Sequence, residues 1–402
     1  MNKALFTLAL LSGASPALAD AVKVKPIVDA RLRYEGVEQV GRPRDADALT
    51  LRIRAGAEAK TNDFMLLVEA EGTYAISEKF NSTTNGKTAF PVVADPENIE
   101  LNRIQLQYSG IKKTLVTVGR QRINLDDQRF VGSVGFRQNE QTFDAARIEF
   151  GGIKNVKADI IYASSVRTIF GIDGIGARPT RIDGDNVFAN LAYKTKYGTL
   201  TGFAYLVDQD ELAVQGFRFS SQTYGARFAG AIPLSKVAKL TYAASYARQS
   251  DYHRNSNDYS ADYVATELGV EAKGIKLLGG YELLGSSSGA ALTSFQTPLA
   301  TLHKFNGAAD LFLTTPPNGL QDLYGTIGYT KPKVGPFDSI GVLANYHDYK
   351  SDRLSLNYGD EINLQVVAKL KKYTFTLKYA DYNARSFATD TKKLFASVEW
   401  AF

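Results

Sequence analysis

The stretch that decides the fold is the end of the chain, Lys392 to Phe402, KKLFASVEWAF. Its residues alternate in character. Every second residue belongs to an apolar set that ends on an aromatic ring: Leu394, Ala396, Val398, Trp400 and Phe402. The set between them includes Lys393, Ser397 and Glu399. Because successive side chains of a β-strand point to opposite faces, this period of two predicts a strand with one apolar and one mixed face.

The other end of the chain has the pattern of an export signal. Met1-Asn2-Lys3 is positive, and Ala4 to Leu11 is an apolar run too short to span a bilayer. Ala17-Leu18-Ala19 has the small-x-small pattern of a cleavage site. We therefore predict a signal peptide over residues 1–19 and a mature chain from Asp20; the alternative is a genuine N-terminal helix. An export signal together with a terminal aromatic strand is typical of a Gram-negative outer-membrane β-barrel.

Composition narrows the class further. The chain has no cysteine, which excludes disulfides, thiol nucleophiles and cysteine-ligated metals. After the signal there is no apolar run of about 18 residues, so no transmembrane helix is predicted. Tyr and Phe number 22 each, and both favour strands and the aromatic girdles of membrane barrels. The whole of residues 20–402 is expected to form one domain, because no linker divides it.

Alternation recurs along most of the chain in segments of about ten residues, the length of a tilted transmembrane strand. Examples are Val28–Glu35, Leu49–Glu58, Phe64–Tyr74, Leu240–Tyr246, Ile340–Tyr346, Ile362–Ala368 and Phe375–Tyr379. Eight short connections alternate with nine longer ones, the asymmetry expected of short periplasmic turns and long extracellular loops. The fold class predicted is all-β: a closed antiparallel transmembrane barrel of 18 strands.

One hairpin gives a prediction of register. If Thr61-Asn62 is a two-residue turn, Arg54 faces Glu69 and Arg52 faces Glu71, which pairs opposite charges on the polar face. A slip of one residue turns all four charges toward lipid. Since each charge costs about 2–4 kcal/mol at the bilayer midplane, the face is strongly specified.

A soluble β-helix or β-sandwich is the alternative fold. Either also shows alternation, but either requires a hydrophobic core. Here the polar face carries Arg, Glu, Lys and Gln in strand after strand, and a packed core does not accept such groups unpaired. The pattern therefore favours a barrel with a water-filled interior.

Arginine is the clearest candidate for function. More than half of the arginines precede residue 150. Predicted lumen-facing residues are Arg31, Arg33, Arg52, Arg54, Arg103, Arg120 or Arg122, and Arg147, interleaved with Glu69, Glu71 and Glu149. One interpretation is a wall that passes anions from site to site, because guanidinium grips carboxylates with paired hydrogen bonds. The other is a salt-bridged ladder that stiffens the lumen. Mixed charge suits a sugar with both hydroxyl and carboxylate groups.

Two stretches carry a family resemblance. They are Val118–Ile148, VGRQRINLDDQRFVGSVGFRQNEQTFDAARI, and Phe295–Gly307, FQTPLATLHKFNG. Both resemble the alginate-export family of outer-membrane proteins. The resemblance implies an 18-stranded barrel with an arginine-lined pore, and it indicates Arg120, Arg129 and Arg147 as pore-lining residues.

Two loops are candidates for a constriction. Ser286 to Gly319 is long for a hairpin connection, and it is expected either to fold into the mouth or to cap the outside. The loop that carries Asp126, Asp127, Arg129 and Arg137 is a second candidate for pointing inward.

Enzymatic function is not indicated. The only histidines are His253, His303 and His347, and none has the spacing of a catalytic triad. No nucleotide-binding or metal-binding motif is present, so no cofactor, metal or catalytic residue is predicted.

The sequence thus predicts a passive, monomeric channel for anionic solutes, an acidic sugar or polysaccharide, integral to the outer membrane. The alternatives are a porin for uptake of small acidic nutrients and a structural or adhesive barrel. Expected partners are outer-membrane lipid and lipopolysaccharide, the barrel-assembly machinery through the strand that ends at Phe402, and the anionic sugar; no nucleic acid is expected. The direction of transport does not follow from the sequence.

Overall fold

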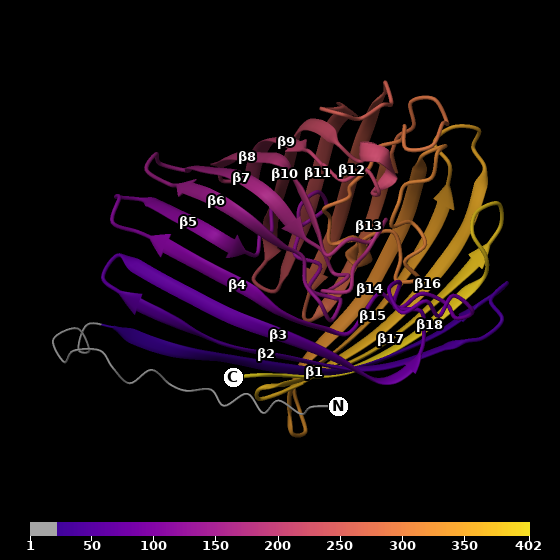
Figure 1. Cartoon of the computed structure of the whole chain (residues 1–402), viewed down its shortest axis with the longest axis horizontal. Helices are drawn as coiled ribbons and strands as arrows, with labels where there is room; N and C mark the ends of the chain where they lie inside the picture. The colour runs from indigo at the N-terminus through magenta and orange to yellow at the C-terminus, as the bar shows by residue number, and fades with distance from the viewer. Residues whose placement is uncertain (1–21) are drawn as a thin grey trace.

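The computed structural model describes residues 22–402, so the predicted signal peptide and the cleavage before Asp20 lie outside the described residues. These residues form one antiparallel sheet of 18 strands that closes into a barrel (Figure 1). The strands are β1 Lys23–Gln39, β2 Ala46–Thr61, β3 Phe64–Lys79, β4 Asn98–Tyr108, β5 Thr114–Gln121, β6 Thr142–Phe150, β7 Val156–Arg167, β8 Arg181–Lys194, β9 Thr199–Val207, β10 Ser221–Ser235, β11 Ala238–Asp251, β12 Ser260–Ala272, β13 Ile275–Leu284, β14 Leu320–Val334, β15 Phe337–Lys350, β16 Asn357–Leu370, β17 Tyr373–Ala384 and β18 Thr391–Ala401.

Each strand pairs with its neighbours in sequence, and β1 pairs with β18 to close the ring. The closing pair runs over eleven residues, from Asp29 opposite Ala401 to Gln39 opposite Thr391. Two 3-10 turns are the described helical elements, η1 Gln215–Phe217 and η2 Leu302–Lys304. No helix among residues 22–402 has the length and apolar character needed to cross a membrane.

The predicted count of strands and the alternation of short and long connections are confirmed. The eight short turns lie at one end of the barrel, at residues 62–63, 109–113, 151–155, 195–198, 236–237, 273–274, 335–336 and 371–372. The nine long loops lie at the other end. In outer-membrane barrels the short turns are periplasmic and the long loops are extracellular.

The predicted register of the β2–β3 hairpin is wrong by two residues. The turn is Asn62-Asp63, with Thr61 opposite Phe64, so Arg54 lies opposite Glu71 and Arg52 opposite Thr73. A shift of two keeps every side chain on its predicted face, because the side-chain period of a strand is also two. The alternation of charge therefore predicted which face each side chain occupies, but it did not predict which residues form the turn.

The two faces differ as the terminal strand predicts. Leu394 and Val398 of β18 are exposed on the outside, whereas Phe395 is buried inside the barrel. The main hydrophobic cluster also lies inside, where inward residues of the strands meet two long loops; its members include Phe143, Phe188, Tyr205, Phe295 and Leu299. The interior is thus packed at the level of these loops, and half-exposed polar residues line it nearer the short turns.

Candidate functional site: a charged lumen crossed by two loops

Two long loops meet inside the barrel: residues 122–141 between β5 and β6, and residues 285–319 between β13 and β14 (Figure 1). A parallel bridge pairs Val131 with Leu299. The amide of Gly132 donates to the Leu299 carbonyl at 2.9 Å, and the amide of Thr301 donates to the Gln128 carbonyl at 3.1 Å. Of the two predicted positions for the Ser286–Gly319 loop, the inward one is therefore the one observed.

Arg129 fixes the tip of the 122–141 loop to the far wall. Its guanidinium is buried, and Nε and Nη2 donate to the two carboxylate oxygens of Glu282 on β13 at 2.7 and 3.2 Å. Nη2 also donates to Asn306 in the 285–319 loop at 3.0 Å. Burial opposes the charge, but Glu282 outweighs it and raises the pKa of Arg129 above its ordinary value. Arg129 thus anchors both loops rather than facing open water.

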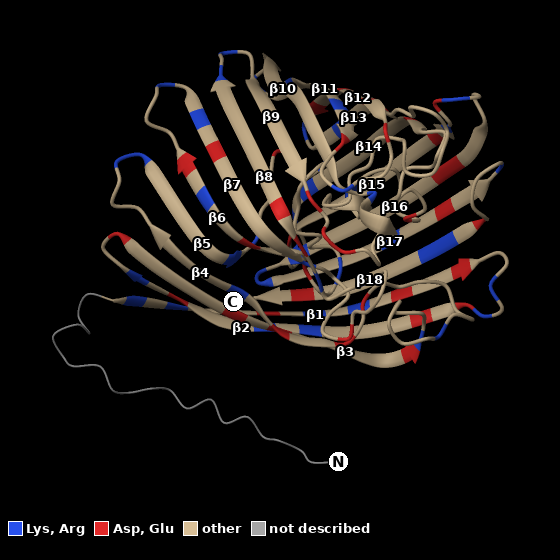
Figure 2. Cartoon of the chain, turned by 45° about the horizontal axis from the view of Figure 1, so that its top comes forward, with Lys and Arg blue, Asp and Glu red and all other residues tan. Residues whose placement is uncertain are grey.

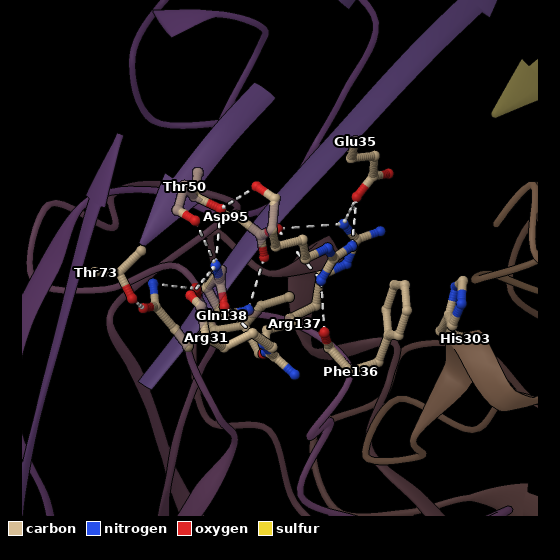
Figure 3. Close-up of polar contacts among 12 residues, drawn as sticks. Arg31, Glu35, Thr50, Thr73, Asp95, Phe136, Arg137, Gln138 and His303 are labelled. Atoms are coloured by element: carbon tan, nitrogen blue, oxygen red, sulfur yellow. Dashed lines mark hydrogen bonds and ion pairs between the residues drawn. The ribbon is translucent and has the colours of Figure 1, made fainter. Parts of the chain in front are cut away.

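The root of the same loop is tied to β1 and β2 through Gln138 (Figure 3). This side chain is fully buried. It donates to the hydroxyl of Thr50 at 2.8 Å and accepts from Nε of Arg31 at 2.8 Å. Arg31 also donates to the loop carbonyls of Gly135, at 3.0 Å, and Arg137. Arg31 therefore faces the interior, but its guanidinium donates its hydrogen bonds to the 122–141 loop rather than to a solute.

A second buried cluster of ion pairs, called the knot below, joins both loops to β1 and β18. Arg137 contacts Glu35 at 3.0 Å and Asp310 at 2.8 Å, and Lys393 also reaches Asp310 at 3.0 Å. Arg33 pairs with Glu35 and lies 4.0 Å above the ring of Phe136. Arg33 is thus buried inside the barrel within this cluster.

His303 lies within this knot, stacked on Phe136 with ring centroids 3.3 Å apart (Figure 3). Its Nδ1 lies 2.6 Å from Asp310, and its Nε2 lies 3.0 Å from the ammonium of Lys378. Burial lowers the pKa of His303 to about 3, despite Asp310. The ring is therefore neutral at physiological pH, accepts from Lys378 and donates to Asp310. Burial would raise the pKa of Asp310, but His303 and Lys393 hold it well below its ordinary value.

Arg52 and Arg54 on β2 are buried in a chain of ion pairs. Arg52 pairs with Asp29 and, at 3.3 Å, with Glu399. Arg54 pairs with Glu71, as the strand register requires, and at 2.7 Å with Glu140 of the 122–141 loop. For these two arginines the structure favours the salt-bridged ladder, because each charge is matched.

Arg103 and Arg122 share Glu69 and are more open. Arg103 reaches Glu69 at 2.6 Å and Arg122 reaches it at 3.3 Å. Arg122 also pairs with Glu140, and its side chain remains 28% exposed. Burial favours the neutral acid at Glu140, but Arg54 and Arg122 outweigh it and lower its pKa. Glu69 is thus a hub that holds two guanidinium groups at the surface of the lumen.

Arg147 lies nearer the short turns, on β6. It pairs with Asp159 at 2.6 Å and with Glu149 at 3.3 Å, and its side chain is 17% exposed. Its register partner on β5 is Thr117, and Thr117 pairs with Gln107 on β4. Arg147 and Glu149 therefore lie on the interior face of β6, and their role in lining the pore stays a prediction.

Arg120 is a correction. It lies opposite Ile104 on β4 and Asp144 on β6, and it pairs with Asp144 at 2.8 Å. Val118 and Ile104, which share its face by strand alternation, are exposed on the outside of the barrel. Arg120 thus lies on the outer face, and Arg122, beyond the end of the strand, takes the predicted place in the lumen.

The open arginines form a descending row on one wall. Arg122 lies above the end of β5, Arg103 comes next on β4, and Arg147 lies level with Gln107, four residues further along β4. At about 3.3 Å per residue that step is about 13 Å. The inward amide of Gln105 lies between Arg103 and Arg147, and that of Gln107 lies level with Arg147. The row offers both charged and neutral donors to a passing solute.

Several of these residues were not predicted. Glu140 and Gln138 follow each other closely in a loop without periodicity, so no pattern indicates which of its polar residues turn inward. Gln105 and Gln107 stand on the alternating face of their strand, and that signal was available in the sequence.

A closed barrel of 18 strands around a charged, loop-crossed lumen defines the class of outer-membrane channels. The sequence model of the family "Alginate export" matches residues 28–277, more than half of the chain. The chain therefore belongs to the alginate export family, as its sequence predicted. It is an integral outer-membrane protein and a passive channel rather than an enzyme.

Solved outer-membrane channels share the fold. OccAB4 of Acinetobacter baumannii is 15% identical over 96% of this chain and 100% of its own, with a TM-score of 0.69. OpdQ of Pseudomonas aeruginosa is 13% identical over 94% of this chain and 98% of its own, with a TM-score of 0.67. OccK9 (OpdG) of the same organism is 12% identical, with coverage of 94% and 98% and a TM-score of 0.69. No curated protein matches the chain in sequence.

Proposed function

We propose that the channel conducts anionic solutes, specifically an acidic sugar or polysaccharide. The observation that carries the proposal is the row of open arginines, Arg122, Arg103 and Arg147, with glutamine amides beside them. Guanidinium binds carboxylate through paired hydrogen bonds, and a series of such sites lets an anion leave one as it reaches the next. Membership of the alginate export family supports the same substrate class.

The acids on this wall shape what passes. Glu69, Glu140 and Asp159 each accept hydrogen bonds from the arginines and so reduce the net positive charge of the row. These acids do not help to bind a simple inorganic anion. They can bind a carboxylated sugar, because its hydroxyls donate to carboxylates while its own carboxylate is held by guanidinium.

A porin for small acidic nutrients is the second candidate. The observation in its favour is that two loops cross the lumen and are bound to each other and to the wall. The crossing loops limit the size of the solute that can pass them, and this favours a monomeric acid over a polysaccharide chain.

The test is single-channel recording in a planar bilayer with a salt gradient. We expect a reversal potential that reports preference for anions, and block of the current by an oligouronate. Replacing Arg122 and Arg147 by Gln is expected to reduce the preference and weaken the block severalfold. Arg120→Gln is the matched control, because it removes the same charge from the outer face. Equal effects of Arg120→Gln and the lumenal variants would contradict the proposal.

A substrate comparison separates the two candidates. Block by an oligouronate at concentrations where a monomeric sugar acid has no effect supports the polysaccharide. Equal affinity for the monomer and the oligomer supports the porin for small acids.

A further inference from the structure

Lysine and arginine are sorted between the two ends of the barrel. The eight short turns hold eight lysines, no arginine and a single acid, Asp63. The nine long loops hold ten arginines, two lysines and fourteen acids. Figure 2 shows blue at several hairpin ends on the side of the short turns. The periplasmic end is thus strongly positive, and the extracellular end is close to neutral.

Further lysines stand on the strands at the periplasmic end, and strand alternation directs them into the lumen. They share their faces with inward residues such as Arg54 on β2, Phe188 on β8 and Glu361 on β16. The lysine crown consists of Lys23, Lys25, Lys60, Lys194, Lys276 and Lys369. It draws on five strands spread around the ring, so it surrounds the mouth rather than forming a patch on one wall.

The lysines of the crown are at least partly exposed to solvent and have no ion-pair partner among the described residues. Within residues 22–402 none of its six ammonium groups has a carboxylate within 4.0 Å, whereas the neighbouring Lys157 and Lys239 pair with Glu149 and Glu271. Five of the six side chains are exposed and Lys276 is half-exposed. This contrasts with the arginines deeper in the lumen, almost all of which have an acid partner.

Lysine is suited to capture rather than retention. Its ammonium is a strongly hydrated point charge on a flexible stem, without the fork that holds a carboxylate in two places. A ring of such charges around an opening raises the local concentration of an anion and its rate of entry. A negatively charged chain arriving from the periplasm meets this field before it meets the arginine row.

We propose that the lysine crown is the loading site of the channel for a polyanionic chain, and that the channel therefore takes up such a chain faster from the periplasmic side than from the extracellular side. This inference rests on the proposed function and adds the site and side of entry. The inward direction of the crown favours a solute in the lumen over the headgroups of anionic phospholipids, which lie outside the wall.

The experiment measures current block by polygalacturonate added to one side of a single oriented channel. Because the chain has no cysteine, a Ser256→Cys variant carrying biotin in the exposed loop between β11 and β12 identifies the extracellular side through streptavidin. We expect block to begin at least threefold faster from the periplasmic side. The difference should shrink between 0.1 and 1 M salt, as the Debye length falls from about 10 to about 3 Å.

A matched pair of triple variants tests the crown itself. Lys194, Lys276 and Lys369 are replaced by Gln in one variant, and the outward-facing Lys331, Lys350 and Lys392 in the other. Both lose three charges, and only the first is expected to lose the faster periplasmic block. If the first variant still shows faster block from the periplasmic side, the inference is overturned. The same conclusion holds if that variant keeps the faster periplasmic block but is no longer stabilised by phosphatidylglycerol, because the crown would then bind lipid.

The outcomes separate the two proposals. A wild-type channel without anion preference and without block from either side refutes the proposed function. Anion preference with equal block from both sides leaves that function standing and refutes only the loading site.

Discussion

Arg129 offers the sharpest test of how the 122–141 loop is held in place across the lumen. Replacing it by Gln removes two charge-assisted hydrogen bonds to Glu282 and the bond to Asn306, and it leaves the Glu282 carboxylate buried without its cation. Breaking a buried ion pair in this way costs about 3–5 kcal/mol. At 1.4 kcal/mol per factor of ten, the bound position of the loop tip loses a factor of about 10² to 4 × 10³ relative to a released one.

The readouts are single-channel conductance and cleavage by trypsin. A released 122–141 loop no longer narrows the lumen, so we expect Arg129→Gln to raise the conductance and to make it fluctuate. The basic residues of the loop should become sensitive to trypsin at concentrations that leave the wild type intact. Adding Glu282→Gln removes the orphaned carboxylate, and it should restore part of the lost stability, on the order of 2 kcal/mol in a double-mutant cycle.

Arg227→Gln is the control on the same stretch of loop. Arg227 of β10 pairs with Asp127 at 3.1 Å, but both side chains are partly exposed, at 19% and 27%. A pair of this kind contributes about 1 kcal/mol or less. If Arg129→Gln keeps wild-type conductance and resistance to trypsin, or if Arg227→Gln matches its effects, the anchoring role assigned to Arg129 is refuted.

Three further predictions concern the same loops. Gln138→Ala leaves several buried partners unpaired, and it should lower the unfolding temperature in detergent at a cost of about 1–3 kcal/mol. Gly307→Ala should destabilise the 285–319 loop, because its φ is +86° and the added Cβ would lie 2.2 Å from Oε2 of Glu361; increased trypsin cleavage of that loop is the check. Stability should fall with acidification from pH 6.5 toward pH 3, since the unfolded chain binds a proton at His303 that the folded chain refuses, and the low pKa of Asp310 acts in the same direction; His303→Gln should weaken that dependence in thermal melts across pH.

The sequence predicted the architecture because alternation is a local signal. A period of two fixes which face of each strand meets lipid, and the spacing of turns fixes the number of strands. The β2–β3 hairpin shows the limit of that signal. A slip of two residues preserves every face, so charge segregation cannot distinguish a turn at Thr61-Asn62 from the observed turn at Asn62-Asp63.

The site was predicted less completely, for a different reason. The structure places Arg31 and Arg54 on the interior face, but their burial depends on contacts with a loop more than 80 residues away in sequence, those of Arg31 with Gln138 and of Arg54 with Glu140. Loop conformation has no periodicity from which to predict such contacts. Arg120 was misplaced because β5 ends at Gln121, between Arg120 and Arg122. Strand alternation applies to Arg120 but not to Arg122 beyond the strand end, so the spacing of the two arginines did not show which of them faces inward.

The seam between β1 and β18 has a consequence for how the protein is made. Its eleven paired positions unite the first and last strands of the ring, so that neither has a permanent partner on that side until the other has been synthesised. During biogenesis both edges expose a full row of amides and carbonyls, which hydrocarbon does not satisfy and which other chains pair with readily. We expect a dedicated insertase to shield the two edges until they zip together, and a chain truncated within β18 to aggregate rather than insert.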